Sequence, residues 1–177
     1  VFPEMFLSGY QLQDLVFKEA FLSDVDRSLE DVSQKVPEGA AVLIGAPKFH
    51  NRKIYNSYFL IRRDSITLSA QKFHLPNKDI FDEERYFAKG NMAKPIQIAE
   101  KIVGTPICED IWYPDVVEHL VNLGADIIVS PNGSPYSRGK AYVRERIVME
   151  RTSENKVPMI YLNLVGGQDD QVFDGGS

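Results

Sequence analysis

Hydrophobic positions recur along this 177-residue chain with two periods, about 3.6 residues in some segments and about two in others. In residues 11–22, for example, Leu12, Leu15 and Val16 share one helical face. We expect Ser23 to cap the helix that follows, and Gly124 to end a later one. The helical period predicts helices over residues 11–22, 23–36, 115–123 and 140–155.

Shorter apolar segments predict strands, over residues 40–46, 55–62, 66–72, 96–99, 102–108, 126–130 and 159–164. The run at 40–46 is uninterrupted, which is typical of a strand covered on both faces. A polar loop is expected over residues 75–91. Hairpins therefore coexist with strand–helix–strand units, and this favours an α/β fold in which helices cover mixed sheets.

Composition and charge narrow the classes of partner. The chain is 44% hydrophobic with a net charge of −5, as expected of one globular domain spanning residues 1–177. This acidic balance disfavours nucleic acid and anionic membranes, and no apolar run approaches the ~20 residues of a membrane span. A single cysteine excludes an internal disulfide and favours a reducing, cytoplasmic location. Three histidines and one cysteine lack metal-ligand spacing, so we expect no bound metal.

That cysteine, Cys108, stands where an apolar strand gives way to a predicted helix. The position suits a nucleophile, because a helix N-terminus favours thiolate over thiol. A buried structural thiol is the alternative. The neighbours Glu109 and Asp110 oppose thiolate formation, so a working nucleophile needs a cation from elsewhere in the chain.

Three residues could assist such a thiol. Lys72, at the end of a predicted strand, could supply the positive charge, although most such lysines are simply solvated. Glu4 follows an apparent strand in apolar surroundings, which raise a carboxyl pKa and suit a general base. Among the histidines, only His74 is a serious alternative as the base.

Six segments together carry a resemblance to a known family. They begin at Phe2, Lys72, Phe81, Cys108, Asn132 and Val165 and read FPEMFLSGY, KFHLPN, FDEERYF, CEDIW, NGSPY and VGGQDDQVFDGGS. The first and fourth resemble the nitrilase (carbon–nitrogen hydrolase) superfamily in general. The second, third and last are similar, more narrowly, to the amidase domains of glutamine-dependent NAD synthetases. The matches extend from the first residues of the chain to the last.

The resemblance implies a four-layer α-β-β-α sandwich, incomplete at both ends, and a role for each matching residue. Cys108 would be the nucleophile, Glu4 the general base and Lys72 the oxyanion partner, with Glu83 as a second, positioning glutamate. His74 would then be a structural neighbour. The residues lining or gating the glutamine pocket would be Tyr10, Trp112, Ser134 and Lys140.

At the level of the whole protein, the resemblance implies hydrolysis of the L-glutamine side-chain amide. The ammonia would serve a synthetase domain in cis, absent from this chain, which amidates nicotinic acid adenine dinucleotide. No cofactor is implied for the amidase chemistry, since ATP and Mg²⁺ belong to that missing domain. A homo-oligomer is also implied.

Two alternatives stay open on the sequence. The chain could be a stand-alone nitrilase-type amidase acting on another small amide, or a catalytically silent module that only binds a partner. Lys78 stands where the family often has an aromatic residue, which puts part of the pocket lining in doubt.

Overall fold

The computed structural model describes residues 1–78 and 81–177. Its helices are η1 (Gln13–Phe17), α1 (Glu19–Lys35), α2 (Glu83–Tyr86), η2 (Cys108–Trp112), α3 (Pro114–Asn122) and α4 (Lys140–Asn155), of which η1 and η2 are 3₁₀. Its strands are β1 (Val42–His50), β2 (Lys53–Arg62), β3 (Ser65–Gln71), β4 (Ile96–Ile98), β5 (Lys101–Gly104), β6 (Ile127–Asn132), β7 (Met159–Asn163), β8 (Val165–Gln168) and β9 (Gln171–Asp174).

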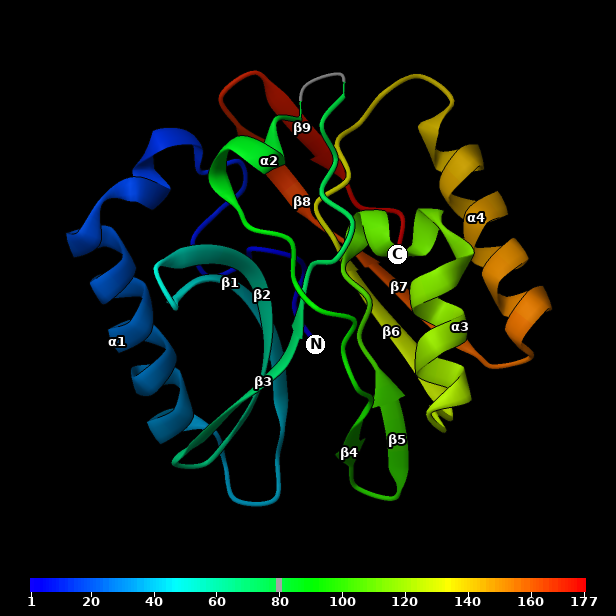
Figure 1. Cartoon of the computed structure of the whole chain (residues 1–177), viewed down its shortest axis with the longest axis horizontal. Helices are drawn as coiled ribbons and strands as arrows, with labels where there is room; N and C mark the ends of the chain where they lie inside the picture. The colour runs from blue at the N-terminus through cyan, green and yellow to red at the C-terminus, as the bar shows by residue number, and fades with distance from the viewer. Residues whose placement is uncertain (79–80) are drawn as a thin grey trace.

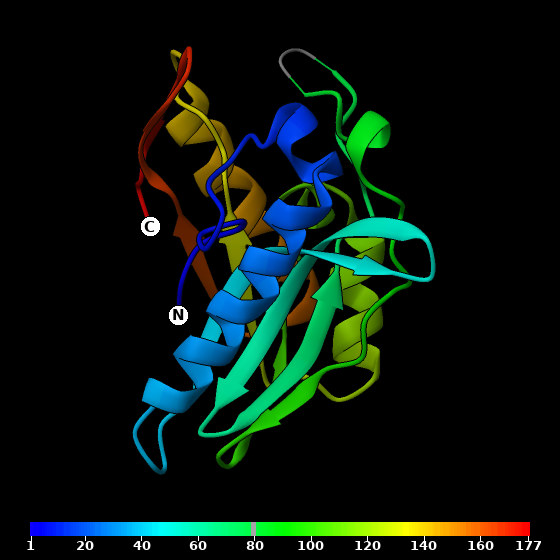
Figure 2. The same ribbon diagram turned by 90° about the vertical axis from the view of Figure 1, so that its left-hand side faces the viewer.

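Two sheets face each other and helices cover their outer faces, giving the expected four-layer α-β-β-α sandwich (Figure 1). The first sheet has the order β1-β2-β3 and is antiparallel throughout. The second has the order β4-β5-β6-β7; β4 pairs antiparallel with β5, whereas β5, β6 and β7 run parallel. Helix α1 lies over the first sheet, as Figure 2 shows, and α3 and α4 cover the second. The hairpin β8-β9 forms a separate two-stranded sheet.

Alternating side chains separate the layers. On β2, Tyr58 and Leu60 pack between the two sheets, whereas Phe59 and Ile61 pack beneath α1. On β6, in the same way, Ile127 and Val129 face the layer between the sheets and Ile128 faces the layer beneath α3 and α4, so these three successive residues are all apolar. This explains the unbroken apolar runs in the sequence.

One end of the sandwich collects the chain segments that carry the candidate residues. Lys72 directly follows β3, Cys108 comes soon after β5, and Gly133 directly follows β6. Glu4 lies in a segment that runs beside β1, where Phe2 N donates to Leu43 O. Residues far apart in sequence therefore meet at a single edge.

The predicted helix over residues 11–22 is wrong. Residues 13–17 form a 3₁₀ turn in which Val16 is buried, and α1 begins at Glu19. Ser23 therefore lies inside α1 and caps nothing, because the extended backbone at Lys18 already sets the helix start. The later helices agree closely with their predicted ranges, and Gly124 follows α3 with a φ of +96°.

Several strand boundaries also differ from prediction. β1 continues to His50, past the apolar run, because its partner β2 pairs with it along the whole length. The β8-β9 hairpin was not predicted, since its exposed Val165 and Val172 follow no buried periodicity. The expected loop over residues 75–91 contains the short helix α2, and residues 79–80 of that prediction lie outside the described residues.

Candidate active site

A lysine held between two carboxylates forms the centre of the site. Lys72 Nζ lies 2.7 Å from Glu4 Oε1, and 3.0 and 2.9 Å from the two oxygens of Glu83. All three side chains are buried. Burial alone would lower the pKa of Lys72, but the charges of Glu4 and then Glu83 outweigh it, and this pKa stands well above its ordinary value. The ammonium form therefore persists at neutral pH.

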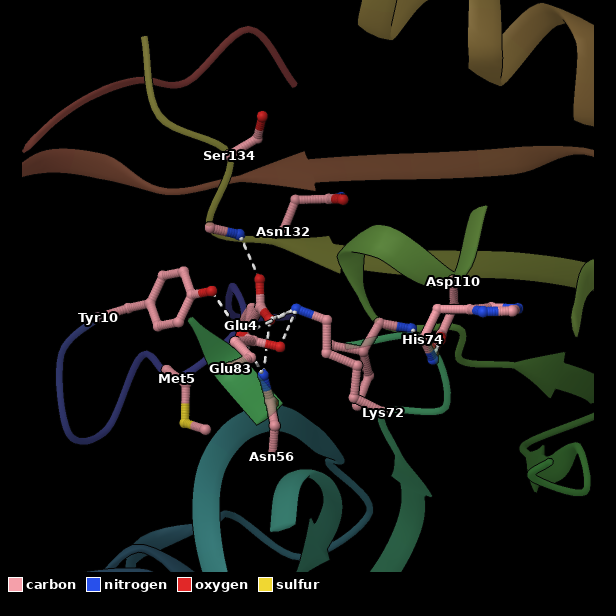
Figure 3. A network of polar contacts seen from close by, with 12 residues as sticks. Glu4, Met5, Tyr10, Asn56, Lys72, His74, Glu83, Asp110, Asn132 and Ser134 are labelled. Carbon is pink, nitrogen blue, oxygen red and sulfur yellow. Dashed lines mark hydrogen bonds and ion pairs between the residues drawn. The ribbon is translucent and has the colours of Figure 1, made fainter. Parts of the chain in front are cut away.

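Glu83, on α2, completes this cluster. Burial raises the pKa of its carboxyl to about 7, with Lys72 opposing the rise and Glu4 adding to it. Tyr10 donates its hydroxyl proton to Glu83 Oε1 over 2.5 Å. Figure 3 shows Tyr10 and Lys72 approaching the carboxylates from opposite sides.

Two further donors fix Glu4. Asn56, on β2, donates from Nδ2 to Glu4 Oε1 at 2.7 Å, and the backbone N–H of Gly133 donates to Oε2 at 2.8 Å (Figure 3). The segment carrying Glu4 fits against β1 only because Gly45 has no side chain: a Cβ there would lie 2.4 Å from the backbone nitrogen of Met5. Both carboxylate oxygens of Glu4 are thus satisfied and held in one orientation.

Cys108 opens η2 with a φ of +47°, in the left-handed region that non-glycine residues rarely adopt. Its thiol is buried, and burial raises its pKa well above the ordinary value. Glu4 and Glu83 add to this rise and Lys72 opposes it, so all three charges act on the sulfur. Burial and the two carboxylates therefore favour the thiol over the thiolate, and the α-helix whose N-terminus would favour the thiolate begins only at Pro114.

Two of the expected pocket residues, Trp112 and Lys140, lie together near the η2 turn that Cys108 opens. Lys140 Nζ lies 4.7 Å from the centroid of the Trp112 ring, a cation–π arrangement. Lys78 lies on the same ring at 5.7 Å and forms an ion pair of 3.1 Å with Glu109. Two cations therefore flank an aromatic ring beside Cys108.

The hydroxyl of Ser134 is engaged by a buried arginine. Its hydroxyl accepts a hydrogen bond from the buried Arg144 at 3.1 Å and, in Figure 3, points away from Glu4. Its backbone N–H donates to Asn163 Oδ1 at 2.9 Å. Arg144 also reaches Asp174, so this loop is tied to both α4 and the end of β9. Tyr10, in turn, belongs to the carboxylate cluster itself.

Comparison with known proteins decides the family. A sequence profile described as carbon-nitrogen hydrolase matches residues 1–177. The chain belongs to the carbon–nitrogen hydrolase family. The resemblance inferred from the six segments is confirmed.

Members of this family named glutamine-dependent NAD(+) synthetase match nearly the whole chain. The protein from Rhodobacter capsulatus is 44% identical over 175 residues, covering 99% of this chain and 32% of that protein. The one from Aquifex aeolicus is 39% identical over 178 residues, covering 99% of this chain and 31% of its own length. The chain thus spans about a third of the length of the curated relatives it matches.

Solved structures agree. The glutamine-dependent NAD+ synthetase from Acinetobacter baumannii superposes with a TM-score of 0.91 at 31% identity, over 98% of this chain and 33% of that one. An amidase from Nesterenkonia sp. AN1 superposes with a TM-score of 0.82 at 19% identity, over 98% of this chain and 65% of the amidase. This second likeness shows the shared fold. The predicted nitrilase-like sandwich is confirmed.

Some residues of this carbon–nitrogen hydrolase site escaped the sequence analysis. Asn56 had a signal, since it interrupts an apolar strand with an amide. The Gly133 N–H had none, because any residue but proline offers one. His74, by contrast, pairs with Asp115 through Nε2 at 2.9 Å and stands on the far side of Lys72 from the carboxylates (Figure 3).

The described residues contain neither a cluster of metal-ligand side chains nor a candidate membrane helix. Within residues 1–78 and 81–177, no group of three or more His, Cys, Asp or Glu side chains is arranged to hold a metal ion. Within the same residues, no helix is both long enough and apolar enough to cross a membrane.

Proposed function

We propose that this chain hydrolyses the side-chain amide of L-glutamine and is the amidase part of a glutamine-dependent NAD synthetase. The buried Lys72–Glu4–Glu83 cluster beside Cys108 carries the proposal. A protonated thiol needs a base and an oxyanion needs a cation, and both stand here in a water-poor site. The name shared by relatives at up to 44% identity supports glutamine as the substrate.

In the first half-reaction, Cys108 Sγ attacks the carboxamide carbon while Glu4 takes the thiol proton. We assign the base to Glu4, as the family resemblance implies, and not to Glu83, which already accepts the Tyr10 hydroxyl. The Lys72 ammonium stabilises the oxyanion, and one such donor is worth about 3 kcal/mol. Glu4 then protonates the leaving nitrogen, ammonia departs, and a γ-glutamyl thioester remains on the sulfur.

In the second half-reaction, Glu4 accepts a proton from water, whose oxygen attacks the thioester carbon. Collapse of this intermediate releases glutamate and returns the proton to the sulfur. Glu83 touches Lys72 and Tyr10 and orients the ammonium. Trp112 and Lys140 would face the amino-acid end of glutamine. The Ser134 hydroxyl already serves Arg144, so the contribution of Ser134 would come through its loop.

The proposal extends to the product. Ammonia would pass to a synthetase domain in cis, where ATP and Mg²⁺ would drive amidation of nicotinic acid adenine dinucleotide. Keeping ammonia away from bulk water makes chemical sense, since the ammonium ion has no lone pair for attack. No residue of this chain is assigned to ATP or Mg²⁺.

A glutaminase assay on the purified protein tests the site. Cys108→Ser, Glu4→Ala and Lys72→Ala should each abolish release of glutamate, whereas His74→Ala should retain most of it. A glutamine-like diazo ketone should add covalently to Cys108, which peptide mass spectrometry would locate. Turnover of other small amides but not glutamine would favour a stand-alone amidase. Absence of both turnover and adduct would favour a silent binding module, and loss of activity in His74→Ala would favour a Cys–His mechanism.

A further inference from the structure

Asp110 is a buried carboxylate to which the proposed chemistry gives no task. Its two oxygens accept three backbone hydrogen bonds. Oδ1 accepts from the N–H groups of Phe73, at 3.0 Å, and His74, at 2.8 Å, and Oδ2 accepts from the N–H of Ile107 at 2.9 Å. One side chain therefore satisfies three backbone donors from two separate parts of the chain.

These backbone donors lie next to two of the proposed catalytic residues. Phe73 and His74 directly follow Lys72, and Ile107 directly precedes Cys108. Lys72 follows a strand of the first sheet and Cys108 comes after a strand of the second, and within the described residues no strand pairing joins the two sheets. Asp110 thus bridges the backbone that carries the ammonium to the backbone that carries the sulfur.

A second polar contact joins the same two segments of the chain. Ser69 and Thr105, three residues before Lys72 and Cys108 respectively, share a buried hydroxyl–hydroxyl hydrogen bond of 2.6 Å. This neutral contact guides the approach of the two segments. The Asp110 contacts lie closer to the reacting groups and involve a charged acceptor, and such bonds are roughly twice as strong as neutral ones.

Burial of Asp110 is costly, which indicates that its bonds are needed to keep it in place. Burial raises the pKa of its carboxyl to about 6, while the N–H groups of His74 and Ile107, followed by the charge of Lys72, oppose the rise. At pH 7 the group is mostly ionised, and all four lone-pair directions of the carboxylate remain acceptors.

We propose that Asp110 is a positioning residue that sets the separation of the Lys72 ammonium from the Cys108 sulfur. This role rests on the proposed glutamine hydrolysis. Asp110 touches neither substrate nor reacting atoms and acts only through the backbone on either side of them. Its loss should therefore slow the chemical steps and leave glutamine binding nearly unchanged.

Asp110→Asn tests the proposal, because it keeps the shape but turns one acceptor oxygen into an NH₂ group facing a backbone N–H. We expect kcat for glutamine to fall about 100-fold, the cost of a misplacement near 1 Å. KM should change by less than about threefold, as for an interaction used only in the transition state. Asp110→Glu, which keeps the charge but displaces it by one methylene, should lower kcat with KM retained and covers the case in which Asp110→Asn does not fold.

Asp126 provides a matched control. Its Oδ2 accepts a backbone hydrogen bond from Ile102 at 2.9 Å, at the end of β5 remote from the site. Asp126→Asn should lower the thermal midpoint and leave kcat unchanged. If the Asp110 variants behave in the same way, with kcat close to wild type, Asp110 is purely structural and the proposal is overturned.

The rate at which iodoacetamide alkylates Cys108 separates this proposal from the function on which it rests. The reagent is no glutamine analogue, and its rate depends on the thiol pKa, which burial, Glu4 and Glu83 raise and Lys72 lowers. Absence of glutamine turnover in the wild type would contradict the proposed function, while an alkylation rate in Asp110→Asn that differs from the rate in Asp126→Asn would still support positioning. Equal alkylation rates in the two variants would overturn the positioning role.

Discussion

Replacing Lys72 by methionine should destabilise the protein in a way that depends on pH. Methionine keeps most of the volume and length of the side chain but removes the positive charge that pairs with both Glu4 and Glu83. Breaking a buried ion pair by removing one partner costs about 3 to 5 kcal/mol. For a protein of this size that loss corresponds to a fall in Tm of about 6 to 20 °C.

The direction of the pH effect follows from linkage. Without Lys72, burial and mutual repulsion push the pKa of Glu83 above the value of about 7 that it has with the lysine present. An acid whose pKa is raised on folding stabilises the folded state most at low pH, and this contribution is lost as the pH rises through the folded pKa. The Tm deficit of Lys72→Met should therefore be small near pH 5 and largest near pH 8.

Thermal unfolding followed by circular dichroism at both pH values provides the measurement. Lys48→Met is the matched control, because Lys48 pairs with Asp26 at 2.8 Å on the surface, where such a pair is worth about 0 to 1 kcal/mol. Adding Glu4→Gln to Lys72→Met should restore part of the lost stability at pH 8. A Tm deficit equal at pH 5 and pH 8, or absent at pH 8, would refute the view that Lys72 holds two buried charges.

Three further predictions concern the groups around this cluster. Tyr10→Phe removes a hydrogen-bond donor that lowers the pKa of Glu83. The acid limb of the kcat/KM pH profile, expected near pH 7, should therefore move to higher pH. An unmoved limb would contradict the assignment of that limb to Glu83. Asn56→Ala leaves Glu4 Oε1 with one donor fewer and should lower the free energy of unfolding by about 1 to 3 kcal/mol, measured by urea denaturation. An unchanged urea midpoint would show that this hydrogen bond is dispensable. Gly45→Ala forces a Cβ to within 2.4 Å of Met5 N and should displace Glu4, which glutaminase activity at a temperature where the variant is folded would reveal.

The sequence marked the members of the proposed site more clearly than the contacts between them. Glu4, Lys72 and Cys108 could be proposed because strand ends and one motif marked them. Asp110 was read as a negative neighbour of the thiol, whereas its carboxylate is turned to backbone N–H groups. Side-chain direction at a tight turn depends on a φ such as the +47° of Cys108, and no periodicity records that angle.

For the fold as well, some features could be predicted from the sequence and others could not. Both layers of strands could be inferred because burial on two faces leaves uninterrupted apolar runs. The helix over residues 11–22 was wrong because Leu12 and Val16, four residues apart, pack into the same core cluster from a 3₁₀ turn as well as they would from an α-helix. The hairpin at residues 165–174 was missed because the valines on it face outward.

The meeting of two sheets at the candidate site has a consequence for how the chain acquires reactivity. Lys72 follows β3 of the first sheet, Cys108 comes after β5 of the second, and Glu4 lies in a segment that must first settle against β1. Glu4, Lys72 and Cys108 come from three separate segments, so a partly folded chain in which the sheets have not docked would lack the proposed site. Catalytic activity would therefore appear in a single step, when the two sheets dock, and its appearance would mark the last step of folding.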